Sequence, residues 1–160
     1  MSAMNPQYPD FSAISNPREV QSLCRGSLVE LLGIQCTLIT PDRVEAVMPV
    51  NEHTCQPFGV LHGGASLAMA ETIAGIGSLA IIGPAEHAVG QQVSGNHVGV
   101  AQLGDTVRGI ATLQHKGRSS HVWHVDIFSQ STGRLVSTAQ VLYAILKNSV
   151  PHSRHDAENA

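Results

Sequence analysis

The sequence predicts an α+β domain in which a curved antiparallel β-sheet wraps one long central helix. Residues 63–82 form an unbroken run of small and apolar residues with Glu71 as its only charge, and Gly83-Pro84 follow as a stop signal. Beyond residue 86 the chain consists of strand-like stretches joined by short turns. Successive hairpins build an antiparallel sheet and not a βαβ fold.

The first part of the chain is expected to form one helix and two strands. Asn16 followed by Pro17 is typical of a helix start, and Gly33 is placed to end that helix. The expected elements are a helix over residues 17–32, strands over residues 34–40 and 43–50, and a polar loop over residues 51–59.

The second part is expected to be all strand. The expected strands span residues 87–100, 106–115, 121–129 and 135–146. Gly90 and Gly95 are the expected bends in the first of them. By composition we expect residues 1–16 to be an irregular arm, residues 17–146 to be a single domain, and residues 147–160 to be a disordered tail.

The composition limits the classes of function. The 160-residue chain has 42 % hydrophobic and 13 % charged residues, which indicates a folded domain with a core and excludes a disordered chain. A formal net charge of −3, with the basic residues spread thinly, argues against a nucleic-acid-binding surface. So few charges also indicate that part of the surface is covered in an oligomer.

The sequence also carries signals about location. The three cysteines form no CxxC pattern, as expected of free thiols in a reducing compartment. The first residues lack the basic start and apolar run of a secretory signal, so we expect a cytoplasmic protein. Residues 65–82 are long enough to cross a membrane, but their Gly and Ala content and Glu71 favour a buried core helix.

Glu71 is the first candidate for chemistry. A lone carboxylate in a segment expected to be buried is costly unless it is paired, hydrogen-bonded or used. A structural ion pair is the alternative explanation, but the helix itself contains no Lys or Arg to provide one. With the His-Gly-Gly helix start nearby, and with the support of the family resemblance given below, we favour a catalytic carboxylate.

Gly63 and Gly64 begin the predicted helix, where backbone N–H groups are free and the dipole is positive. Such groups can polarise a carbonyl, although glycines required only for a turn would leave the same pattern. Gly63 and Glu71 lie about 12 Å apart along one helix at 1.5 Å per residue. If both act in one reaction, the second group must come from an antiparallel helix of a second copy, which predicts two equivalent sites per dimer.

Other polar residues are weaker candidates. Gln56 and His62 lie in the loop before the helix and could bind a water or a carbonyl, or could have no role. Arg118, Ser119 and Ser120 form a turn that could take phosphate oxygens, but an ordinary hairpin turn looks the same. No Cys/His ligand spacing predicts a metal site.

The segments QPFGVLHGGASLAMAET and HKGRSSHVWHVDI resemble hotdog-fold acyl-CoA thioesterases. The similar branch includes 4-hydroxybenzoyl-CoA, 1,4-dihydroxy-2-naphthoyl-CoA and PaaI-like thioesterases. The resemblance implies the hotdog fold, a homodimer at minimum and commonly a homotetramer, an acyl-CoA or aroyl-CoA substrate, and no cofactor or metal. It also implies roles for a set of residues: Glu71 as nucleophile or base, Gly63 as the N–H donor, His62 and Gln56 around the thioester and water, His97 in the acyl pocket, and Arg118, Ser119 and Ser120 against coenzyme A.

One position departs from the family pattern. Four residues after the catalytic carboxylate these enzymes often carry Ser or Thr, and this chain has Gly75. Either a neighbouring group or water replaces that hydroxyl, or the rate is lower. The run of Ala74, Gly75 and Gly77 also removes bulk beside the carboxylate and could admit a larger acyl or aryl group, which makes Gly75 a candidate substrate-binding position. Two alternatives to a thioesterase share the fold: a hydratase or dehydratase, and a non-catalytic acyl-CoA-binding protein.

Overall fold

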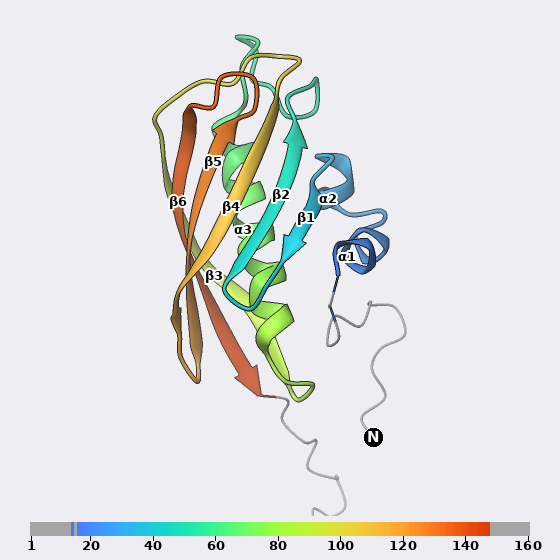
Figure 1. Cartoon of the computed structure of the whole chain (residues 1–160), viewed down its shortest axis with the longest axis vertical. Helices are drawn as coiled ribbons and strands as arrows, with labels where there is room; N and C mark the ends of the chain where they lie inside the picture. Colours follow the sequence, from blue (N-terminus) through green and yellow to red (C-terminus); the bar gives the residue numbers. More distant parts are fainter. Residues whose placement is uncertain (1–13, 15, 148–160) are drawn as a thin grey trace, which may run out of the picture.

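The computed structural model of the chain describes residue 14 and residues 16–147. Its described part is one antiparallel sheet with a long helix packed along one face (Figure 1). The elements in chain order are α1 (Pro17–Leu23), α2 (Leu28–Leu31), β1 (Gln35–Ile39), β2 (Arg43–Pro49), α3 (Gly63–Ile81), β3 (Glu86–His97), β4 (Thr106–Lys116), β5 (Ser120–Ser129) and β6 (Leu135–Lys147). The predicted fold class is confirmed.

The sheet has the strand order β1-β2-β4-β5-β6-β3, and each neighbouring pair is antiparallel. Because β3 pairs only with β6 in the described chain, its other edge is open. β5 alternates buried and half-buried residues along its whole length, as a strand does when one face covers a core and the other faces outward. The sheet therefore has an inner face against α3 and an outer face.

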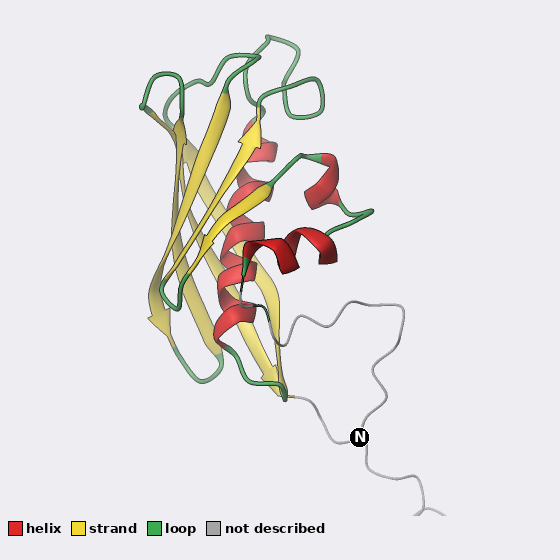
Figure 2. Cartoon of the chain, turned by 45° about the vertical axis from the view of Figure 1, so that its right-hand side comes forward, coloured by secondary structure: helices red, strands yellow, loops and turns green. Residues whose placement is uncertain are grey.

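The core lies between α3 and the inner face of the sheet. Met69 and Ile73 on α3 and Trp123 on β5 are fully buried, and the Trp123 Nε1–H donates to the Ser78 hydroxyl at 2.9 Å. On β2, Val44, Ala46 and Met48 are all fully buried. Figure 2 shows α3 against the strands, with α1 and α2 at the side of the molecule.

The single helix expected over residues 17–32 is wrong. The chain forms α1 and α2 with a turn between them, in which Gly26 has a φ of 71°. The Ser27 hydroxyl donates to the Cys24 carbonyl, and the Gly26 N–H donates to the Glu30 carboxylate at 2.6 Å. These local bonds compete with a continuous helix. Leu28, the first residue of α2, is 59 % exposed.

The boundaries of the other elements differ from expectation by a few residues. β3 ends at His97 and not at residue 100, and its register shifts between Gly90 and Gln92, which confirms one of the two expected bends. No shift occurs at Gly95. Residue 14, expected in an irregular arm, is buried against the core. The rest of the expected arm before Asn16, and the expected tail beyond Lys147, lie outside the described residues.

Helix α3 is long and apolar enough to cross a membrane by length and composition alone, as the core helix of a folded domain also can be. In the structure 56 % of its apolar window is buried inside the chain, and the helix packs against the sheet. The prediction that residues 65–82 belong to a core helix agrees with this packing.

Candidate active site

The start of α3 carries a free backbone donor. His62 is the N-cap, and its Nδ1 accepts from the Gly64 N–H at 2.8 Å. The His62 N–H itself donates to the Thr54 carbonyl at 2.8 Å, which anchors the loop before the helix. The Gly63 N–H makes no hydrogen bond to any described residue. The first turn therefore presents one unsatisfied N–H at the positive end of the helix dipole.

His97 packs directly on this helix start. A Cβ built at Gly63 would lie 2.5 Å from the His97 Nε2, so the imidazole occupies the space of the missing side chain. The His97 Nδ1 lies 3.1 Å from the hydroxyl of Ser137, which is fully buried. When Nδ1 carries the proton and donates to Ser137, Nε2 is left as an acceptor beside Gly63. The structure thus brings the sequence-predicted residues Gly63, His62 and His97 together within one chain.

Gln56 lies in the loop that leads to the same helix start. Its backbone closes a turn, because the Gly59 N–H donates to the Gln56 carbonyl at 3.0 Å and Gly59 has a φ of 75°. The loop is tied to the segment before β4 by a bond from the Leu61 N–H to the Ala101 carbonyl at 2.9 Å. The Gln56 side chain is half-buried and makes no hydrogen bond within the described chain, so its amide remains available.

Glu71 is exposed in the single chain, contrary to the expectation that its segment of the helix is buried. The sheet covers α3 on one side only, and a stripe of the helix stays uncovered; this stripe consists of Leu67, Ala68, Glu71 and Thr72. The Glu71 carboxylate lies against β3, where its Oε1 is 2.6 Å from the position of a Cβ built at Gly90. No Lys or Arg of the described chain pairs with it.

The space that Gly75 leaves on α3 is filled. The Tyr143 side chain of β6 reaches over Gly75, with its Cζ 2.9 Å from the position of a Cβ built there. The Tyr143 hydroxyl donates to the backbone carbonyl of Glu71 at 2.8 Å. Gly75 is itself buried, so in the single chain the Tyr143 ring and not open space lies beside it, and the larger acyl pocket stays a prediction.

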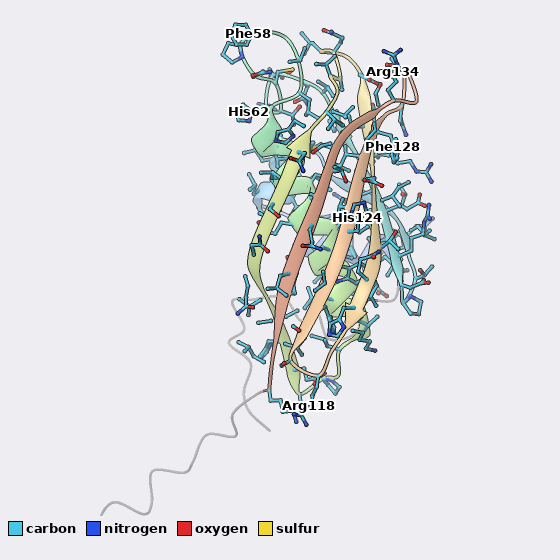
Figure 3. The ribbon with its side chains drawn as sticks, turned by 90° about the vertical axis from the view of Figure 1, so that its left-hand side faces the viewer. Phe58, His62, Arg118, His124, Phe128 and Arg134 are labelled. Carbon is cyan, nitrogen blue, oxygen red and sulfur yellow. The ribbon has the colours of Figure 1, made fainter. Side chains whose placement is uncertain are left out.

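The Arg118, Ser119 and Ser120 turn lies far from this helix start in the single chain. Figure 3 shows Phe58 and His62 at one end of the molecule and Arg118 at the other. Arg118 and Ser119 are exposed, and the turn is held by a bond from the Gly117 N–H to the Ser120 carbonyl at 2.8 Å. One copy of the chain therefore does not bring its basic turn to its own Gly63.

Three residues at the site were not found from the sequence: Ser137 behind His97, Gly90 against Glu71, and Tyr143 over Gly75. Each contacts a residue distant in the chain, and the contact depends on strand register. Gly90 was noted only as a bend. Tyr143 carried a weak signal as a polar-tipped aromatic in an apolar strand.

Comparisons with known proteins identify the family. A family model described as the thioesterase superfamily matches residues 58–136. The chain is 39 % identical to the proofreading thioesterase EntH of Cronobacter turicensis over 76 % of this chain and 87 % of that protein. It is 37 % identical to the 1,4-dihydroxy-2-naphthoyl-CoA hydrolase of Escherichia coli K12, over 79 % of this chain and 92 % of that protein.

A solved structure gives the same result for the fold. The crystal structure of thioesterase HI1161 from Haemophilus influenzae superposes with a TM-score of 0.81 at 32 % sequence identity. The match covers 89 % of this chain and 98 % of that one, so the likeness extends over the whole domain. By fold and sequence, the chain belongs to the thioesterase superfamily and is a thioester hydrolase.

Proposed function

We propose that the protein hydrolyses an acyl-CoA or aroyl-CoA thioester to the free acid and coenzyme A, at a site shared by two copies of the chain. The Gly63 N–H of one copy polarises the thioester carbonyl, and Glu71 of the other copy acts as nucleophile or general base. His62, Gln56 and His97 surround the carbonyl and the water. The observation that carries the proposal is one free N–H and one exposed carboxylate, held about 12 Å apart along α3.

That separation supports a site made by two chains. A glutamate side chain cannot span about 12 Å of helix and also attack a carbonyl held at the helix start. A second copy with its α3 antiparallel to the first removes the difficulty, because each Glu71 then lies beside the other copy's Gly63. Two-fold symmetry produces two such sites in each dimer.

The open edge of β3 supports the same dimer. β3 has 12 residues, most of them exposed, and its free edge presents unpaired backbone groups. Pairing with β3 of a second copy would satisfy these groups and cover the uncovered stripe of α3. His62 and Arg118 lie at opposite ends of one copy (Figure 3), so an antiparallel second copy would bring its Arg118 turn to the His62 end of the first. There Arg118, Ser119 and Ser120 would bind the phosphates and pantetheine of coenzyme A. We further propose that two dimers associate into a homotetramer in the cytoplasm.

The chemistry needs only these groups and water. Glu71 attacks the carbonyl carbon and forms a mixed anhydride that water hydrolyses, or it removes a proton from a water that attacks directly. In either route negative charge develops on the carbonyl oxygen, where the Gly63 N–H stabilises it. The carbon–sulfur bond then breaks, and the coenzyme A thiolate takes up the proton that water released.

The direct test is thiol release from a panel of aryl-, short-chain and long-chain CoA thioesters. Glu71→Gln and Glu71→Ala are expected to lower kcat by about 1,000-fold or more while the dimer persists in gel filtration. Near wild-type turnover in both variants would overturn the assignment of Glu71. Enoyl-CoA supplied in parallel, followed by loss of the double bond, separates a hydratase from a thioesterase.

The role of the Gly63 N–H can be tested apart from its lack of a side chain. Proline is tolerated at the first residue of a helix, and the His62 ψ of 132° suits a following proline. Gly63→Pro removes the N–H, whereas Gly63→Ala keeps it, and both meet His97 in the same way. We expect kcat to fall about 100-fold further in the proline variant than in the alanine variant. Equal rates in the two variants would exclude the donor role.

Mixed dimers test whether the site is shared. A dimer that combines a Glu71→Ala chain with a Gly63→Pro chain contains one intact pair if the two groups come from different chains, and none if they come from the same chain. The isolated mixed dimer of these two inactive variants is therefore expected to have about half of the wild-type turnover, because one of its two sites is restored. No recovery in a verified mixed dimer would place both groups of one site in a single chain.

A further inference from the structure

We propose that Tyr143 is a positioning residue for Glu71, and that its hydroxyl does from β6 what a hydroxyl at position 75 would do from α3. The inference rests on the proposed role of Glu71 in thioester hydrolysis. It starts from two facts of geometry: the Tyr143 hydroxyl bonds the Glu71 carbonyl, and the tyrosine ring occupies the space above Gly75.

The bond is made to the backbone of the residue that carries the chemistry. In a helix the carbonyl of Glu71 also faces the N–H of Gly75, four residues on. A Ser or Thr at position 75 would donate its hydroxyl to this same carbonyl, since such residues bond the carbonyl four residues before them. Tyr143 supplies a donor to that acceptor at 2.8 Å although it lies 72 residues away in the chain.

Gly75 is explained by this arrangement. Any side chain at position 75 would collide with the Tyr143 ring, whose Cζ would lie 2.9 Å from the added Cβ. A glycine inside a helix costs about 1 kcal/mol relative to alanine. Glycine at this position leaves the space that the Tyr143 ring occupies, so Gly75 and Tyr143 depend on each other.

The carboxylate of Glu71 is constrained by the same group of residues. Gly90 and Tyr143 are register partners on β3 and β6. A Cβ at Gly90 would lie 2.6 Å from the Glu71 Oε1 and 3.7 Å from the Tyr143 Cζ. Glu71 is therefore anchored at its backbone by the tyrosine hydroxyl, while its carboxylate rests beside the tyrosine ring against a glycine.

The tyrosine is suited to a permanent donor role. It is only 9 % exposed, and its ring faces the core between α3 and the sheet. Burial, and then the negative charge of Glu71, raise the pKa of the Tyr143 hydroxyl, so that the hydroxyl keeps its proton at neutral pH. An anchor of this kind limits the motion of an otherwise exposed catalytic side chain, and its loss should appear in kcat and not in KM.

Tyr143→Phe is the first test, because it keeps the ring and removes only the donor. We expect kcat to fall about 10-fold with KM changed less than twofold, since misplacement of a catalytic group by a fraction of an ångström lowers the rate. Ser78→Ala is the matched control. Like Tyr143→Phe it removes one buried hydroxyl, but the Ser78 hydroxyl lies on α3 and accepts a hydrogen bond from Trp123. The control is expected to lower the melting temperature and to leave kcat unchanged. An unchanged kcat in Tyr143→Phe would overturn the proposal.

A rescue experiment tests the equivalence of the two hydroxyls. Gly75→Ser alone is expected to lower kcat, because its Cβ displaces Tyr143. Gly75→Ser combined with Tyr143→Leu opens the space and returns a donor to the Glu71 carbonyl, so kcat should recover at least threefold over Tyr143→Leu alone. Additive losses in the double variant would overturn the equivalence.

The Glu71→Gln background separates this proposal from the proposed function. If Tyr143 acts through Glu71, Tyr143→Phe should produce no further loss in the residual turnover of Glu71→Gln. An equal further loss in that background overturns the positioning role and leaves the thioesterase assignment intact. Wild-type turnover in Glu71→Gln itself overturns the assignment of Glu71, whatever Tyr143→Phe does.

Discussion

Gly75 and Gly77 are near neighbours on α3, and each receives an aromatic ring in the space of its missing side chain. At Gly77 the ring is that of Trp123, whose Cη2 lies 2.5 Å from the position of an added Cβ. At Gly75 it is that of Tyr143. Both aromatic side chains also donate a hydrogen bond to the helix, Trp123 to the Ser78 hydroxyl and Tyr143 to the Glu71 carbonyl.

The Gly77–Trp123 and Gly75–Tyr143 pairs pack in the same way, but only the second lies at the proposed catalytic carboxylate. Trp123 is fully buried, and its partner Ser78 is also fully buried, so that this contact only holds the helix on the sheet. Tyr143 holds the turn of α3 that carries the exposed carboxylate. A change at the first pair should therefore alter stability alone, whereas a change at the second should alter stability and rate together.

Alanine at each of the two glycines is the most direct way to break the comparison. Both variants add a Cβ that meets a ring, and overpacking of this kind costs about 1–3 kcal/mol. Gly77→Ala should lower the free energy of unfolding with kcat per folded molecule unchanged. Gly75→Ala should lower the free energy of unfolding and also kcat, since Tyr143 must leave the Glu71 carbonyl. Urea unfolding and thiol-release kinetics on the same samples measure both quantities. Equal kcat in the two variants would remove the distinction.

Much of this architecture could be predicted from the sequence, because the signals are local. The apolar run of α3, the Gly-Pro stop and the hairpin turns each lie within a few residues and indicate one helix and an antiparallel sheet. Local patterns also misled. The start signal at Asn16-Pro17 and the stop signal at Gly33 predicted one helix and did not reveal the turn at Gly26, where a positive φ and side-chain bonds interrupt it.

The candidate site residues could be predicted only where they lie close together in one segment of the sequence. Glu71 and Gly63 could be found because a lone carboxylate and a glycine at a helix start are unusual in their own surroundings. Tyr143 could not, because its relation to Gly75 arises from the register of β6 against β3 and from the way α3 crosses both. The expectation of free space at Gly75 has the same origin, since a missing side chain indicates space but not what fills it.

Gly90→Ala tests the contact between β3 and the Glu71 carboxylate. The added Cβ meets the far end of the Glu71 side chain, which is flexible and exposed, so the carboxylate can move aside. We expect a change in the free energy of unfolding below about 1 kcal/mol, because alanine also lowers the entropy of the unfolded chain. The rate should nevertheless fall several-fold, since the displaced group is the proposed catalytic carboxylate. A loss of stability with unchanged kcat would show that Gly90 serves packing alone.

The smallest expected effect is an alkaline titration that reports on the Tyr143–Glu71 contact without any substrate. The chain has two tyrosines, so in Tyr8→Phe the tyrosinate absorbance belongs to Tyr143 alone. Burial and then the charge of Glu71 raise the pKa of Tyr143. The residue opposite Tyr143 on β5 is His121, whose pKa is lowered by burial and then by the charge of Lys116. The negative charge beside the hydroxyl is thus that of Glu71, and Glu71→Gln should bring the pKa of Tyr143 part of the way back toward its usual value of about 10.

The stability of the fold should follow the same titration. A raised pKa means that the folded chain keeps the Tyr143 proton where the unfolded chain has lost it. The contribution is therefore fully present below a pH of about 10 and is lost as the pH rises from there toward the folded pKa. The difference in unfolding free energy between Tyr8→Phe and the Tyr8→Phe/Tyr143→Phe variant, followed by urea titration across this range, isolates the term. A difference in unfolding free energy that does not depend on pH would mean that the Tyr143 hydroxyl is not buried against Glu71. The proposed anchoring of Glu71 by Tyr143 would then lose its physical basis.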